Sequence, residues 1–375
     1  MNTKFDDIRP CNDAEIPEAM NRIADSELLP GIAKFVFPEK ELSEVQKLLR
    51  SFTNILDFQV GVMFAFNQQV ILRSIDEFTY SGTEYLDPAK SYLFISNHRD
   101  IVMDSSLLQF LLHLDGFRTT EITFGSNLMS SQLIIDIGRS NKMFKVMRGE
   151  NPRDFYNSSL HLSEYIRHTI TERNESIWIA QRSGRTKDGN DITDQGILKM
   201  FCMSGGKDTV QALNTLNVVP VAISYQYEPC DFFKTRELYL SRNGKKYIKE
   251  KNEDLISVLT GITQFKGNVH INICEPLRQE ELQVPVTEKS ANNFYKNVAN
   301  LIDRRIYSNY KLCDTNYIAH DLRSKTNTYA TRYTAQNKEQ FVQRYNQVLD
   351  KFDTDKEIVG QIFLGIYANS VDNVL

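Results

Sequence analysis

The chain has 375 residues, long enough for one large domain with appendages or for two domains. Its hydrophobic share of 41% and charged share of 25% are those of an ordinary globular protein, which excludes a disordered or low-complexity chain. The formal net charge of −4 argues against a dedicated nucleic-acid binder, because such proteins are normally basic. We therefore expect a globular protein without a nucleic-acid partner.

The cysteine pattern and the lack of long apolar stretches bear on location. The five cysteines are Cys11, Cys202, Cys230, Cys274 and Cys313, and no two form a CxxC pair. A disulfide scaffold or a zinc site needs denser spacing, so we expect reduced cysteines in a cytoplasmic protein. No uninterrupted apolar stretch reaches the roughly 18 residues of a membrane span. We expect a protein that is soluble or lies on a membrane surface.

The first part of the chain has the apolar spacing of helices. The expected helices cover residues 15–35, 40–56 and 57–73. After residue 79, short apolar runs alternate with longer helical segments. The expected strands are 92–96, 121–124, 144–147, 177–180 and 218–224, with 238–240 and 269–273 as further candidates. The expected helices between them are 101–114, 130–137, 152–172 and 196–216. This alternation predicts an α/β domain with a mostly parallel central sheet and flanking helices.

Helices are expected again towards the end of the chain, over residues 293–307 and 339–367. The polar stretch 321–338 between them has the composition of a loop or linker. We expect three regions: a helical N-terminal region (1–75), an α/β core (76–280) and a helical C-terminal region (281–375).

A histidine follows the first expected core strand, where α/β proteins bind ligands. Asn97, His98, Arg99 and Asp100 come directly after that strand. If Asp100 caps the next helix, Asp104 lies one turn inside it and leans back towards His98. A neutral imidazole can take a proton from a hydroxyl near neutral pH, and a carboxylate can hold its tautomer. The alternative is a loop histidine beside a carboxylate that only supports the helix.

Cations follow two later strands. Lys145 and Arg148 lie at the end of one, and Arg182, Arg185 and Lys187 lie around Gly184 after the next. Arginine binds phosphate or carboxylate with two donors, and glycine lets the backbone approach such a group. The alternative is a set of solvated surface charges. Beside a His–Asp pair, we interpret these residues as an anion site.

Four sequence blocks carry a resemblance to a known family. They are NHRDIVMD (97–104), FKVMRG (144–149), IAQRSGR (179–185) and VVPVAIS (218–224). Their order resembles the lysophosphatidic acid and glycerol-3-phosphate acyltransferase superfamily. The resemblance covers about residues 90–225 and leaves both helical ends unexplained.

The resemblance implies acyl transfer from acyl-CoA or acyl carrier protein to a lipid hydroxyl, with 1-acylglycerol-3-phosphate as the expected acceptor. It implies a role in phospholipid biosynthesis, peripheral location at the inner face of the membrane, and no metal or cofactor beyond the thioester co-substrate. His98 and Asp104 match the family's catalytic pair. Arg148, Gly184 and Arg185 match its positions for the acceptor's phosphate, and Pro220 matches a proline that shapes the acyl site.

Two departures from the family pattern leave alternatives open. Five residues separate His98 from Asp104, whereas the commonest family spacing is four, and Ser183 stands where a glutamate is usual. An O-acyltransferase for an aminoacyl lipid, with a carboxylate instead of a phosphate, is one alternative. A catalytically inactive member that binds lipid is the other.

A membrane contact is expected through an amphipathic helix. The first candidate is residues 23–37, which offer Leu28, Leu29, Ile32, Phe35, Val36 and Phe37. The helix over 57–73, with Phe58, Val62, Phe64 and Phe66, competes with it. Both helices packing on the core is the alternative.

Overall fold

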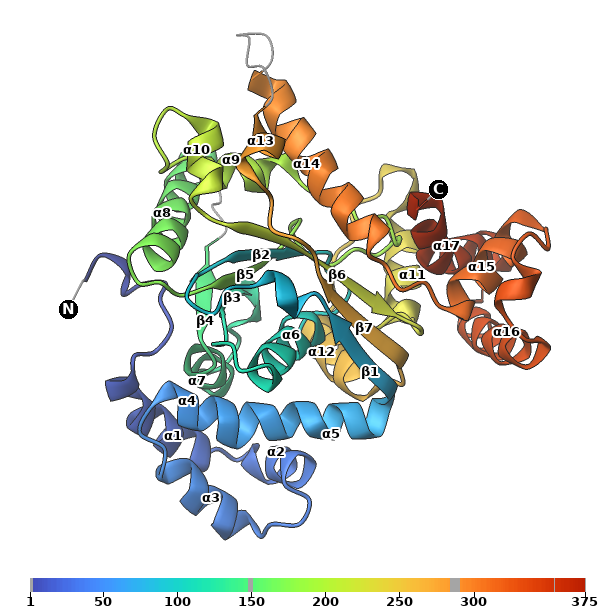
Figure 1. Cartoon of the computed structure of the whole chain (residues 1–375). Helices are drawn as coiled ribbons and strands as arrows, with labels where there is room; N and C mark the ends of the chain where they lie inside the picture. The colour runs from blue at the N-terminus through green and yellow to red at the C-terminus, as the bar shows by residue number, and fades with distance from the viewer. Residues whose placement is uncertain (1–2, 148–150, 284–290, 354, 375) are drawn as a thin grey trace.

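The structure is a computed structural model that describes residues 3–147, 151–283, 291–353 and 355–374 (Figure 1). In these residues seven strands form one sheet, in the order β1-β7-β6-β2-β5-β3-β4. The strands are β1 (Ile75–Ser81), β2 (Leu93–Ser96), β3 (Glu121–Gly125), β4 (Met143–Val146), β5 (Ile177–Ala180), β6 (Val218–Tyr225) and β7 (Gly267–Ile273). All neighbours pair in parallel except β6 and β7. The expected α/β class with a mostly parallel sheet and helical ends is confirmed.

Both faces of the sheet are covered, as a parallel sheet requires. Successive residues of a strand point to opposite faces. In β2, Leu93 and Ile95 join one buried cluster, and Phe94 joins the other. The apolar run of this strand is therefore continuous instead of alternating. The sequence predicted six of the seven strands; β1, an edge strand with two acidic residues, was missed.

The N-terminal helices form a third buried cluster beside the sheet. They are α1 (Ile16–Ala24), α2 (Leu29–Val36), α3 (Leu42–Arg50), α4 (Ile55–Phe58), the π-helical turn η3 (Gln59–Met63) and α5 (Phe64–Ser74). The single helix expected over 15–35 is divided, because Pro30 fits only in the first turn of α2. The continuous run Ile55–Ser74 is, among the described helices, the one long and apolar enough to cross a membrane by length and composition.

Helices connect the strands of the core, and a short one follows the last strand. They are α6 (Met103–Leu114), α7 (Gln132–Ser140), α8 (Pro152–Thr171), α9 (Gln195–Cys202), α10 (Thr209–Asn214), α11 (Asp231–Ser241), α12 (Glu253–Thr263) and α13 (Gln279–Leu282). The strand expected at 238–240 is wrong, because these residues lie in α11; three residues are too few to separate the two periodicities. The helix expected over 196–216 is split between α9 and α10, where Gly206 has a φ of +85°.

The C-terminal region is helical, and its described residues form four helices where two were expected. They are α14 (Ala291–Ser308), α15 (Asp314–Ser324), α16 (Ala335–Leu349) and α17 (Lys356–Val374). The helix expected over 339–367 is divided into α16 and α17, and α15 is additional. Helix α15 enters the stretch expected to be a linker. Its Asp321 is buried and accepts hydrogen bonds from the Tyr329 amide and the Tyr333 hydroxyl. These bonds hold the polar segment after α15 against the end of the helix. Figure 1 shows α15, α16 and α17 together at one end of the molecule, near α11.

Candidate active site

The loop that carries His98 is tied to the sheet by its first residue. Asn97 is buried, and its side-chain amide donates to the Ile223 carbonyl at 2.9 Å and accepts from the Ile223 amide at 2.8 Å. These bonds continue the pairing of β2 with β6 beyond the end of β2. The chain therefore leaves the sheet in a fixed direction at His98.

His98 and Asp104 lie within hydrogen-bond distance. His98 Nδ1 is 2.8 Å from Asp104 Oδ2. Helix α6 begins at Met103, two residues later than expected, and its N-cap is Val102 instead of Asp100. The Asp100 carboxylate instead accepts from the amides of Val102 and Met103, which leaves Asp104 in the first turn of α6.

Four donors converge on the buried Asp104 carboxylate. Oδ2 accepts from the Arg99 amide at 2.6 Å and the Asp100 amide at 2.9 Å, as well as from His98. Oδ1 accepts from the Tyr225 hydroxyl at 2.7 Å. Burial and the negative charge of Asp104 raise the pKa of Tyr225 well above its ordinary value, so Tyr225 stays a donor. The carboxylate is thus fixed in position beside the imidazole.

The His98 ring has one nitrogen engaged. A carboxylate only accepts, so the contact with Asp104 assigns the proton to Nδ1 and leaves the Nε2 lone pair as an acceptor. In the described part of the chain Nε2 has no hydrogen-bond partner, and the His98 side chain is 13% exposed. Trp178 packs edge-on against the ring, with the ring centres 5.7 Å apart. The arrangement suits a base that acts through Nε2.

The loop after β5 returns to His98. The Gln181 amide donates to the Ser96 carbonyl, and the Thr186 amide donates to the His98 carbonyl at 2.7 Å. Between them, Gly184 has a φ of +74°, a conformation that favours glycine. At Gly189 a Cβ would lie 2.3 Å from the Ile366 carbonyl oxygen of α17, so the loop fits only with glycine there.

The loop after β5 contains buried polar atoms without a partner among the described residues. Arg185 is partly buried, and its Nη1 has no hydrogen-bond partner among the described residues. The same holds for both amide atoms of the fully buried Gln181 and for the Thr186 hydroxyl. Buried polar groups are normally hydrogen-bonded. These atoms are therefore buried donors and acceptors that no described residue satisfies.

The other expected anion-site residues lie apart from His98 or are already paired. Lys145 is inside β4 instead of in the loop after it, and β4 is about 14 Å across the sheet from β2, three strand spacings. The strands β4 and β5 are consecutive in the chain, but β3 lies between them. Lys187 pairs with Glu237 at 2.7 Å. Arg182 is partly exposed in the loop after β5. Arg148 lies outside the described residues.

Pro220 lies inside β6, opposite Ile95 of β2, and its carbonyl accepts from the Cys274 amide. It is buried in the centre of the sheet. Its position is in the strand that ends at Tyr225, the donor to Asp104.

A buried network of charged residues, which was not predicted from the sequence, supports the His98 loop through Arg99. Arg99 donates to Asp191 Oδ2 from Nη2 at 2.6 Å and to Glu228 Oε2 from Nη1 at 3.1 Å. Lys234 donates to Glu228 Oε1 and to the Arg99 carbonyl. Burial tends to lower the pKa of Arg99, but Asp191 and Glu228 outweigh it and raise that pKa well above its ordinary value. The charges of two cations and two carboxylates thus compensate each other in this buried network.

The C-terminal helices complete this network. Ser370 of α17 accepts from Arg99, Tyr310 after α14 donates to Asp191, and Tyr367 of α17 donates from its hydroxyl to Asp231 and accepts from the Glu228 amide. No local pattern in the sequence predicts these contacts, because each joins residues far apart in the chain.

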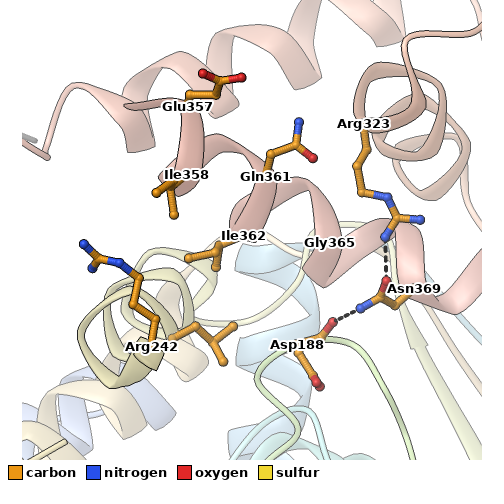
Figure 2. Close-up of a pocket in the computed structure, with 10 residues that line it drawn as sticks. Asp188, Arg242, Arg323, Glu357, Ile358, Gln361, Ile362, Gly365 and Asn369 are labelled. Atoms are coloured by element: carbon orange, nitrogen blue, oxygen red, sulfur yellow. Dashed lines mark hydrogen bonds between the residues drawn. The ribbon is translucent and has the colours of Figure 1, made fainter. Parts of the chain in front are cut away.

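A surface cavity of about 630 Å³ lies beyond the loop after β5. It is lined by Asp188 of that loop, by Leu238 and Arg242 of the α11 region, and by Arg323 and α17 residues including Ile362. Figure 2 shows Asn369 between Arg323 and Asp188; its amide donates to the Asp188 carbonyl and its oxygen accepts from Arg323. The cavity does not include His98. Within the described residues, no group of three or more His, Cys, Asp or Glu is arranged to hold a metal ion.

Comparison with known proteins gives a match among solved structures. The chain is similar to the 1-acyl-sn-glycerophosphate (LPA) acyltransferase PlsC from Thermotoga maritima, with a TM-score of 0.37 and 13% sequence identity, over 77% of this chain and 93% of that chain. No protein-family model matches the chain, and no curated protein sequence matches it. The function proposed below therefore rests on the residues around His98 and on the sequence blocks that surround them.

Proposed function

We propose that this chain is an O-acyltransferase that moves a fatty acyl group from a thioester, acyl-CoA or acyl carrier protein, to the hydroxyl of a lysophospholipid-type acceptor. The observation that carries the proposal is the His98–Asp104 pair at the carboxyl end of a parallel strand, with Nδ1 bound to the carboxylate and Nε2 without a hydrogen-bond partner among the described residues. The order of the four sequence blocks supports the same chemistry. The expected acceptor is 1-acylglycerol-3-phosphate.

In the proposed mechanism His98 is the general base. Its Nε2 takes the proton of the acceptor hydroxyl while that oxygen attacks the thioester carbonyl. The C–S bond then breaks, and the imidazolium returns the proton to the leaving thiolate. The Asp104 carboxylate stabilises the imidazolium through Nδ1, and the Arg99 and Asp100 amides and Tyr225 keep Asp104 in place. No covalent intermediate on the protein is needed, because a thioester already has a good leaving group.

Arg185 is the proposed partner of the acceptor's anionic group. Its unpaired Nη1 and the left-handed turn at Gly184 lie in the loop that bonds to the His98 carbonyl. A guanidinium binds phosphate with two parallel donors. Arg148 and Arg182 remain proposed contributors to the same group. Pro220 keeps its proposed role in shaping the acyl site.

A carboxylate would satisfy Arg185 equally well, and Ser183 replaces the usual glutamate of this loop. An aminoacyl lipid with a free hydroxyl is therefore the second candidate acceptor. Either acceptor is a lipid, so we also propose that the protein acts at the inner face of the membrane. We propose no nucleic-acid partner.

The test is an acyl-transfer assay with the purified full chain. The protein is incubated with acyl-CoA or acyl carrier protein and, separately, with 1-acylglycerol-3-phosphate and with a hydroxylated aminoacyl lipid. Products are extracted and identified by mass spectrometry, and free thiol release is measured in parallel. We expect an acylated lipid and one thiol per transfer with the first acceptor. Thiol release with neither acceptor would support an inactive member instead.

A further inference from the structure

Helix α12 has an exposed apolar face. Leu255, Ile256 and Leu259 are 45%, 47% and 54% exposed. Their spacing places them within about a 100° arc of the helix. The opposite face, with Ser257 and Gly261, is buried. Just before the helix, Ile248 is 80% exposed. We call these four apolar residues the α12 face.

A basic segment adjoins the α12 face. Lys245, Lys246 and Lys251 are exposed, and none of them forms an ion pair with a described residue. The nearby acidic groups are already engaged. Glu250 pairs with Arg236, Asp254 pairs with Lys249, and Glu253 accepts from the Tyr247 hydroxyl. Three cations therefore remain unpaired beside an apolar surface.

The buried side of α12 lies against the His98 loop. A Cβ at Gly261 would meet Asp100 Oδ2 at 2.0 Å, so the helix backbone approaches the loop closely. The Cys230 thiol, after β6, donates to the Ser257 carbonyl. At the other end, Asn127 after β3 donates to Asp254. The helix thus runs along the carboxyl ends of the strands, where Figure 1 shows it in gold beside α6 and above α5.

We propose that the α12 face and the lysines at 245, 246 and 251 dock the protein onto an anionic lipid bilayer. This inference rests on the proposed function, because a lipid acceptor must reach His98 from a membrane. Apolar side chains enter the boundary between headgroups and acyl chains, and lysines beside them attract anionic headgroups. The three unpaired lysines attract an anionic bilayer, whereas two copies of this surface facing each other would bring like charges together.

The N-terminal candidates for membrane contact offer less continuous apolar surface. Leu28, the residue before α2, is 65% exposed, whereas Leu29 and Val36 of the helix are buried in the N-terminal cluster. In the continuous run Ile55–Ser74, Leu56, Val60 and Leu72 are 59%, 43% and 77% exposed, and Leu72 lies about 160° around the helix from Leu56. Leu28 and Leu72 therefore provide controls, since each is an exposed leucine away from α12.

The experiment measures co-sedimentation of the full chain with vesicles at low salt. One set is pure phosphatidylcholine, and the other contains about one-third phosphatidylglycerol. The variants are Leu255→Gln/Ile256→Gln/Leu259→Gln and Lys245→Gln/Lys246→Gln/Lys251→Gln, with Leu28→Gln and Leu72→Gln as controls. Thermal unfolding checks that each variant is folded.

We expect the wild type to prefer the anionic vesicles. Each lysine contributes about fivefold at an anionic surface, so the triple lysine variant should bind them about 100-fold more weakly. The triple α12-face variant should lose binding to both vesicle types, and the controls should bind like the wild type. Loss of binding in the Leu28 or Leu72 control, with the α12 variants unchanged, would overturn the proposal. So would a dimer that the α12-face variant dissociates, without vesicle binding.

A second readout separates this proposal from the proposed function. With a short-chain acceptor that dissolves as a monomer, the α12 variants should keep the wild-type rate of acyl transfer. With acceptor embedded in vesicles, their rate should fall in proportion to the lost binding. Vesicle binding without acyl transfer would overturn the proposed function and support the docking surface. Acyl transfer to the soluble acceptor without vesicle binding would overturn the docking surface alone.

Discussion

Arg99 Nη2 donates a hydrogen bond to the Ser370 hydroxyl at 3.0 Å, although the two residues are 271 positions apart. Arg99 directly follows His98, and its own amide bonds to Asp104. Ser370 lies in α17, which also supplies Tyr367 to the Glu228 amide. The C-terminal helices therefore support the loop that carries the proposed base, and the sheet alone does not complete the site.

The first prediction concerns this support. Arg99→Ala should lower the free energy of unfolding by about 3–5 kcal/mol, because Asp191 would stay buried without its cation and Glu228 would keep only Lys234. Urea unfolding measures this effect. Arg118→Ala is the control, since Arg118 pairs with Glu175 at the surface and such pairs contribute about 0–1 kcal/mol. Equal effects of the two substitutions would contradict the buried network.

The second prediction concerns the proposed base. His98→Ala should lower the rate of acyl transfer by about 10²–10⁴-fold with the fold intact, because it removes the group that accepts the hydroxyl proton. Product formation and circular dichroism are measured together. His168→Ala, on α8 and paired with Glu172, is the control and should keep the wild-type rate. Near-wild-type turnover of His98→Ala would mean that another group is the base.

The third prediction concerns the carboxylate. Asp104→Asn should reduce turnover and also lower the free energy of unfolding by about 1–3 kcal/mol. The reason is that an amide NH₂ in place of Oδ2 would face the Arg99 and Asp100 amide donors, and in place of Oδ1 it would remove the acceptor of the Tyr225 proton. Kinetics and urea unfolding are compared with Tyr225→Phe, which removes only one donor and should have the smaller effect on both. An Asn variant as stable as the wild type would show that these bonds contribute little.

The fourth prediction concerns the anion partner. Arg185→Ala should raise the KM for a phosphorylated acceptor and leave the KM for the thioester donor unchanged, because a phosphate contact binds substrate and transition state alike. Arg148→Ala is expected to act in the same direction. Steady-state kinetics with each substrate varied in turn measures both constants. A change confined to the donor KM would place the phosphates of CoA at these arginines instead.

The fifth prediction concerns pH. Burial raises the pKa of Asp303 to about 6, from an ordinary 3.8, while hydrogen bonds from Thr193 oppose the shift. A raised carboxyl pKa contributes stability at low pH that is lost as pH rises through 6. Between pH 5 and 7.5 the wild type should therefore lose about 1.4 kcal/mol relative to Asp303→Asn, whose amide is always neutral. Urea unfolding at both pH values measures the difference, and a gap that does not change with pH would refute it.

The sequence by itself determined the α/β core. Apolar runs such as 177–180 and 218–224 form β5 and β6 as expected, because buried parallel strands are apolar on both faces. It also predicted that His98 and Asp104 lie close together, because a short loop before a helix leaves little freedom between them. Local spacing was enough for these features.

Only the tertiary structure decided which charges surround that pair. Lys145 and Arg185 were both expected at strand ends, but Lys145 lies inside β4, and the strand order puts β5 beside β2 and places β4 three positions away. Arg99 is next to His98 in the sequence, but its partners come from the segment after β6, the loop after β5 and α17. Strand order and long-range contacts depend on how the whole chain packs, and no local pattern encodes them. The exposed apolar face of α12 could not be predicted for the same reason. Which side of a helix is buried depends on the neighbours that pack against it.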